Sequence, residues 1–129
     1  MMRKFRDVHF TLRIVTGSII LLHGLLRIIF INKYIDFVLQ NFSDVVASET
    51  ILLIGAALFP FIEFFTGLLI ITNVALKRSL IAGFLISVVM VGFILAGGLY
   101  PRLIYHSVVF ALLFLLTDKQ NKLKARRLI

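Results

Sequence analysis

Apolar residues gather into four stretches of the chain, each long enough, or nearly so, to cross a hydrocarbon core about 30 Å thick. The predicted spans cover residues 12–31, 51–76, 80–99 and 103–117. The fourth is shorter than the roughly 20 residues that a transmembrane helix needs, so we expect its ends to lie near the membrane interfaces. The pattern predicts an all-α polytopic membrane protein of one domain, an antiparallel bundle of four transmembrane helices.

The segment between the first two spans, residues 33–50, has a different pattern. Its apolar residues recur every three to four positions, which predicts one or two short amphipathic helices on the outer surface. These residues are Tyr34, Ile35, Val38, Phe42, Val45 and Val46. Two roles are open for this outer segment. It is a lid that only packs over the bundle, or a lid that gates it or docks a partner.

Ionisable residues interrupt three of the spans. Glu63 falls at the middle of the second span, and His106 lies in the outer half of the fourth. His23 and Arg27 stand four residues apart on one face of the first span. A charge at the membrane centre costs roughly 3 kcal/mol on insertion scales, so we expect these faces to turn inward and Arg27 to pair with Glu63. His23 and Glu63 share one depth, and Arg27 and His106 share a second depth one turn further out.

This polar cluster has two interpretations. It is either a buried lock that fixes the helix register, or a small pocket in the outer half of the membrane. In the pocket, His23, Glu63 and His106 would donate, accept or relay protons, and Arg27 would hold an anionic or carbonyl oxygen. No metal site is predicted, because Arg27 would repel a cation and no H-x-x-x-H spacing exists. We expect Phe30, Phe59 and Phe110 to lie near the pocket, where their flat rings could stack on a ligand.

The other small and aromatic residues have structural interpretations. Pro60 is expected to kink the second span, either freeing a carbonyl near the pocket or serving packing alone. Several small residues of the third span and its outer end are expected to let helices approach closely: Gly83, Ser87, Gly92, Gly97 and Gly98. The tyrosines are expected at the membrane interfaces, where such amphipathic rings are common: Tyr34, Tyr100 and Tyr105.

The composition agrees with a membrane protein and excludes chemistry that depends on thiols. Apolar residues make up 60% of the chain and charged residues 16%, against roughly 25% charged residues in ordinary soluble domains. The chain contains no cysteine. This excludes thiol–disulfide exchange by the chain, and it also excludes haem or iron–sulfur ligation through thiolates.

The net charge of +8 reflects topology rather than binding to nucleic acid. If the chain crosses the membrane four times, most of its 14 Lys and Arg residues fall on one side. The positive-inside rule then places both termini, including the basic tail of residues 118–129, in the cytoplasm beside anionic headgroups. The basic residues of that side are Arg3, Lys4, Arg6, Arg13, Lys77, Arg78, Lys119, Lys122, Lys124, Arg126 and Arg127.

Two motifs resemble those of a known family. The first helix carries Arg13-Ile-Val-Thr-Gly17 and then His23-Gly24-Leu-Leu-Arg27, and the second carries Glu63-Phe-Phe-Thr-Gly67 followed by Leu-Leu-Ile. They resemble the R-x-x-x-G, H-G-x-x-K and E-x-x-x-G-x-L-L patterns of the DoxX/MauE-like membrane proteins. The resemblance covers roughly residues 12–95.

The resemblance implies a four-helix bundle and a loose association with respiratory redox chemistry. For DoxX this is quinone-linked thiosulfate oxidation, and for MauE it is maturation of a periplasmic dehydrogenase. Two positions depart from the family pattern: Arg27 replaces the commoner Lys, and Asn73 stands near the expected second glycine. Thiol-based roles of redox-associated relatives do not transfer to a chain without cysteine.

Three functional hypotheses follow. The first is an accessory subunit of a redox or envelope complex, whose pocket binds a quinone as cofactor and uses His23, Arg27, Glu63 and His106 to bind and protonate its oxygens. The second is a non-catalytic assembly or anchoring subunit with a structural polar cluster. The third is a small proton-coupled carrier, which the absence of inverted repeats disfavours.

These hypotheses also predict the location of the protein and its partners. We expect the bacterial cytoplasmic membrane, contact with membrane lipids, and either a larger membrane or periplasmic protein partner or a homo-oligomer. No nucleic acid is expected as a partner. No autonomous active site is visible in the sequence, so enzymatic activity by the chain alone is not predicted.

Overall fold

The structure, a computed structural model, describes residues 1–127 and is helical throughout most of them. Four of the helices are long and apolar enough to cross a membrane, and no strand occurs within the described residues. The predicted all-α membrane bundle is confirmed. The elements are α1 (Met2–Ile29), α2 (Ile31–Phe42), α3 (Glu49–Thr72), α4 (Leu76–Ala96), the 3-10 helix η1 (Tyr100–Arg102) and α5 (Leu103–Arg127).

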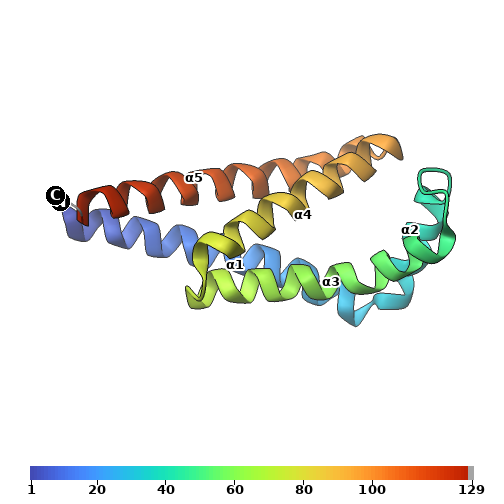
Figure 1. The fold of residues 1–129 in the computed structure, drawn as a ribbon, viewed down its shortest axis with the longest axis horizontal. Coiled ribbons are helices and arrows are strands. Elements are labelled where there is room, and N and C mark those ends of the chain that lie inside the picture. The colour runs from blue at the N-terminus through green and yellow to red at the C-terminus, as the bar shows by residue number, and fades with distance from the viewer. Residues whose placement is uncertain (128–129) are drawn as a thin grey trace.

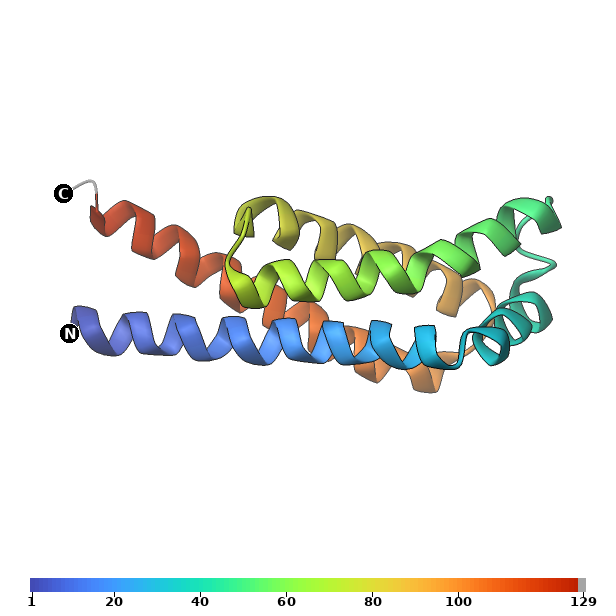
Figure 2. The same ribbon diagram turned by 90° about the horizontal axis from the view of Figure 1, so that it is seen from below.

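The long helices run antiparallel, and α2 lies across one end of the bundle (Figure 1). At the other end, the start of α1 and the end of α5 project beyond the turn between α3 and α4 (Figures 1 and 2). Both helices are longer than the predicted spans of 12–31 and 103–117, because hydropathy detects only the apolar part of a helix. The predicted basic tail continues α5 as helix to Arg127, and residues 128–129 lie outside the described chain.

Short, well-defined breaks separate the helices. A single residue, Phe30, ends α1 and precedes α2. The Ser48 hydroxyl caps α3 by accepting a hydrogen bond from the backbone N–H of Ile51 at 3.4 Å. At the far end of α3, Asn73 and Ala75 adopt left-handed backbone conformations with φ of 61° and 47°, and this tight turn makes α3 and α4 antiparallel neighbours.

The closest helix contact joins α1 to α3 through glycines. A Cβ added to Gly67 would lie 2.4 Å from the backbone nitrogen of Leu21, and one added to Gly24 would lie 2.6 Å from that of Phe64. Gly17 faces the same interface. By contrast, a Cβ on Gly92 meets nothing within 4 Å, so the prediction that Gly92 permits a close helix approach is wrong. The two backbones of α1 and α3 therefore touch directly, as in small-residue interfaces of membrane proteins.

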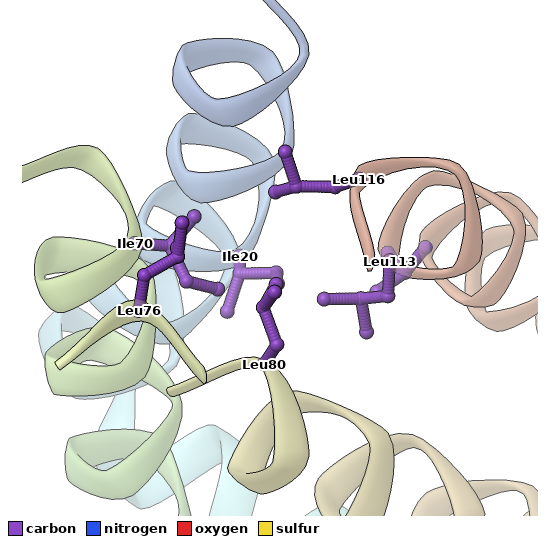
Figure 3. Packing of buried hydrophobic residues seen from close by; sticks show 7 residues of the cluster. Ile20, Ile70, Leu76, Leu80, Leu113 and Leu116 are labelled. Carbon is purple, nitrogen blue, oxygen red and sulfur yellow. The ribbon is translucent and has the colours of Figure 1, made fainter. Parts of the chain in front are cut away.

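Two apolar clusters hold the bundle together. The first joins α1, α3, α4 and α5 near the α3–α4 turn, and its side chains converge on one point (Figure 3). The second packs α2 onto the first part of α3. The labelled members of the first cluster are Ile20, Ile70, Leu76, Leu80, Leu113 and Leu116. The polar site lies between the two clusters.

The outer segment forms the predicted amphipathic helix, α2, followed by a short turn into α3. It buries Val38 and Phe42 against the bundle. Phe42 also contacts α4, since its ring meets the ring of Phe93 edge to face with centroids 5.3 Å apart. The guanidinium of Arg102 lies 4.1 Å from the centroid of the Phe37 ring, which ties η1 to α2. This helix packs as a lid, and a gating or docking role stays a prediction.

Candidate functional site

The site is built around the carboxylate of Glu63, which is only 3% exposed. Its Oε2 accepts a hydrogen bond from Nη1 of Arg27 at 2.9 Å, and its Oε1 lies 2.8 Å from Nδ1 of His23. The predicted pairing of Arg27 with Glu63 is confirmed. His23 joins the same carboxylate, because the i, i+4 spacing places both α1 side chains on the face that packs against α3.

Beside this cluster lies a cavity of about 310 Å³. His23, Arg27 and His106 line its polar end, and apolar side chains of α2, α3 and α4 form most of its wall. Glu63 does not line the cavity. The prediction that this carboxylate faces a ligand is therefore wrong. Glu63 lies behind His23 and Arg27 and holds both of them toward the cavity.

Aromatic rings fix the orientation of His23. The ring of Tyr105 stacks on it with centroids 4.1 Å apart and planes 21° apart, and the ring of His106 meets it edge to face at 6.3 Å. The Tyr105 hydroxyl is buried and has no hydrogen-bond partner among residues 1–127. Tyr105 lines the cavity, and its prediction as an interfacial residue stays a prediction. Its only sequence signal is that it directly precedes His106.

Of the three phenylalanines expected near the pocket, Phe59 alone lines the cavity. Phe30 is 53% exposed, with the ammonium of Lys33 5.6 Å from its ring centroid. Phe30 does not continue the inward face of α1 because the helix ends at Ile29. Phe110 is 41% exposed and lines a separate groove between α4 and α5. The predictions for Phe30 and Phe110 are wrong.

The lid contributes a second phenol to the site. Tyr34 of α2 lines the cavity, and the guanidinium of Arg27 lies 4.8 Å from the centroid of its ring. Burial raises the pKa of Tyr34; the charge of Arg27 acts in the opposite direction, and that of Glu63 in the same direction. The phenol therefore stays protonated at neutral pH and keeps its hydroxyl hydrogen as a donor.

Pro60 leaves one backbone carbonyl of α3 without its usual helical partner. Proline has no backbone N–H, so the carbonyl of Ala56, four residues earlier, lacks its helical partner. Ala56 lines the cavity, and Pro60 is fully buried within α3. The two interpretations of Pro60, a freed carbonyl near the pocket and packing alone, both stay predictions.

Comparison of the chain with protein-family models, with curated proteins and with solved structures finds no match. Within residues 1–127, no group of three or more histidine or acidic side chains is placed to hold a metal ion. The motif residues Gly17, Gly24 and Gly67 form the α1–α3 contact, and Arg27 and Glu63 pair across it. These motifs therefore have a structural role in this chain, and the resemblance to the DoxX/MauE-like proteins stays a prediction.

Proposed function

We propose that this protein is a DoxX-like integral membrane accessory subunit of a redox or envelope complex, and that its cavity binds a quinone-like headgroup. The observation that carries the proposal is the group of donors at one end of an otherwise apolar cavity, where Arg27, Tyr34 and Tyr105 line the wall. The Tyr105 hydroxyl is buried beside the cavity and has no protein partner among the described residues, and leaving such a donor unsatisfied costs about 1–3 kcal/mol. A ligand oxygen that reaches this hydroxyl would remove that cost.

The size and lining of the cavity suit a flat, oxygen-bearing ring. An apolar cavity of about 150 Å³ is enough to bind benzene, and this one has about 310 Å³. Phe59 and Phe93 line the apolar part, where a ring can stack. Arg27, Tyr34 and Tyr105 line the polar part, and each has N–H or O–H groups that donate to carbonyl oxygens.

Glu63 orients the side chains of His23 and Arg27 through hydrogen bonds. As a carboxylate it only accepts hydrogen bonds, so Nδ1 of His23 donates its hydrogen to Glu63 and Nε2 remains free for a proton or a ligand hydrogen. Arg27 uses one of its N–H groups on Glu63, and its other N–H groups can hold a carbonyl oxygen. A bound quinone would supply reversible electron and proton transfer. His23 and His106 are the groups of this chain suited to move protons at that end of the cavity.

A non-catalytic assembly or anchoring role is the second candidate, and one observation favours it. Both oxygens of Glu63 are already bonded to α1 side chains, directly beside the closest backbone contact of the bundle at Gly24 and Gly67. Such a pair can specify the register of two helices without binding anything. Under this alternative, the partner protein would contact the lid.

Ligand binding distinguishes the two candidates. Detergent-purified protein is titrated with decylubiquinone by calorimetry, and its co-purifying lipids are identified by native mass spectrometry. We expect Tyr105→Phe to weaken binding about two- to tenfold, because one hydrogen bond is lost, and Arg27→Ala to weaken it about tenfold or more. The matched control is Tyr100→Phe, since Tyr100 is 62% exposed and does not line the cavity.

Other results would favour the anchoring subunit. One is equal decylubiquinone binding by wild type, Tyr105→Phe and Tyr100→Phe. Another is a chain that carries only bulk phospholipid yet co-purifies with a larger protein in every variant. In that case Glu63→Gln would lower stability without any change in ligand content.

We also propose the bacterial cytoplasmic membrane as the location, with both ends of the chain in the cytoplasm. Three basic segments support this orientation: the start of α1, the Lys77–Arg78 pair and the end of α5. The start of α1 and the end of α5 lie at the same end of the bundle (Figure 2). The positive-inside rule assigns such an end to the cytoplasm, and α2 then lies on the outer side.

A further inference from the structure

A second cavity, independent of the quinone proposal, lies at the end of the bundle opposite α2. It has a volume of about 480 Å³ and is bounded by the projecting parts of α1 and α5 and by the end of α3. Figure 1 shows these parts of α1 and α5 side by side beyond the α3–α4 turn. The lining is mixed: Phe10 and Leu123 are apolar, and polar side chains come from Arg6, His9, Arg13, Gln120 and Lys124.

The charges around this cavity are unbalanced. Arg6, Arg13 and Lys124 supply three cations, and Asp7 is the only acid in the lining. The three cations repel each other across the cavity. An anion bound between them would be attracted to all three and would offset that repulsion. The lining amides of Asn73 and Gln120 add further N–H donors.

Two residues that line the cavity each have a buried nitrogen atom without a hydrogen-bond partner within residues 1–127. These atoms are Nε2 of His9, a side chain only 7% exposed, and Nε of Arg13. Buried polar atoms in proteins are nearly always paired. These nitrogens lie just behind the surface of the cavity, and the surplus of positive charge in its lining indicates a ligand that is both anionic and rich in acceptor oxygens.

The walls of the cavity are held in place by aromatic contacts. The ring of Phe5 on α1 lies between two cations of α5, with Lys119 Nζ at 4.4 Å and the Arg126 guanidinium at 4.6 Å from its centroid. Such cation–π contacts stabilise a pair of helices without neutralising charge. The projecting parts of α1 and α5 are therefore joined, and the cavity between them is preformed.

We propose that this cavity binds one phosphate group, held by Arg13 and Arg6 with His9 and Lys124 at its sides. Guanidinium groups bind phosphate oxygens with two parallel hydrogen bonds. The cavity begins where the apolar core of the bundle ends, and basic pockets between membrane helices bind anionic headgroups. The phosphate can belong to an anionic lipid or to a free ion, and the experiment separates these sources.

The test uses the full-length protein in detergent and compares variants of equal charge. Native mass spectrometry follows a titration with phosphatidylglycerol, with phosphatidylcholine as the zwitterionic reference. We expect one phosphatidylglycerol per wild-type chain, about tenfold weaker binding for Arg13→Gln, and about fivefold weaker binding for Lys124→Gln. The control is Arg3→Gln, an exposed residue of the same helix that does not line the cavity, and it should bind like wild type.

Inorganic phosphate is the second probe. If phosphate raises the melting temperature of wild type but not of Arg13→Gln, and displaces phosphatidylglycerol, the source is a free ion. If it does neither, the ligand is a lipid headgroup. Equal losses in Arg3→Gln and Lys124→Gln, or equally tight binding of phosphatidylcholine, would overturn the proposal. Lys124 is exposed, so its variant decides the question even if Arg13→Gln does not fold.

Discussion

Replacing Gly67 by alanine tests whether the α1–α3 contact holds the site together. The added Cβ would lie 2.4 Å from the nitrogen of Leu21 and 2.7 Å from the carbonyl oxygen of Gly17. Both are backbone atoms, so no side-chain rotation relieves the clash, and the two helices must move apart. The movement would also separate Arg27 from Glu63, because these residues lie on the same pair of helices.

The magnitude follows from two opposing effects. Overpacking a close contact costs about 1–3 kcal/mol, whereas an alanine in a helix is favoured over glycine by about 0.8–1.0 kcal/mol. Gly92→Ala isolates the second effect, because a Cβ there meets nothing within 4 Å. We therefore expect Gly92→Ala to be neutral or slightly stabilising, and Gly67→Ala to be less stable than it by about 1–3 kcal/mol.

The assay is reversible unfolding in mixed micelles, followed by circular dichroism, for wild type and both variants. Calorimetry with decylubiquinone on the folded proteins gives a second readout, where Gly67→Ala should bind more weakly and Gly92→Ala should not change. Equal unfolding free energies for the two variants would refute the reasoning. They would mean that the helices are not in backbone contact at Gly67.

Two further predictions concern the ion pair and the topology. Glu63→Gln should lower the unfolding free energy by about 3 kcal/mol or more, because it leaves the charge of Arg27 buried without its partner. The double variant with Arg27→Met should recover part of this loss in the same unfolding assay, and a loss equal to the sum of the single variants would argue against a coupled pair. Since the chain has no cysteine, single cysteines report topology: a membrane-impermeant maleimide should label Asp44→Cys but not Lys4→Cys in intact cells. The reverse labelling pattern would overturn the proposed orientation.

The sequence by itself determined the fold class and one partner of the buried charge. Crossing the hydrocarbon core demands length and hydrophobicity, and both can be read from the chain without any knowledge of packing. A charged group at that depth must find a partner. Depth along the helices placed His23 level with Glu63, and Arg27, one turn away on the same face, was the cation expected to pair with the carboxylate.

Only the tertiary structure decided which side chains face the cavity. That choice depends on the rotation of each helix about its axis and on where each helix ends, and sequence spacing gives neither. The break at Phe30 removed that ring from the predicted face, and the rotation of α5 turned Phe110 outward and Tyr105 inward onto His23. The basic cavity between α1 and α5 arises in the same way. Its two walls come from opposite ends of the chain and meet only when the helices pack.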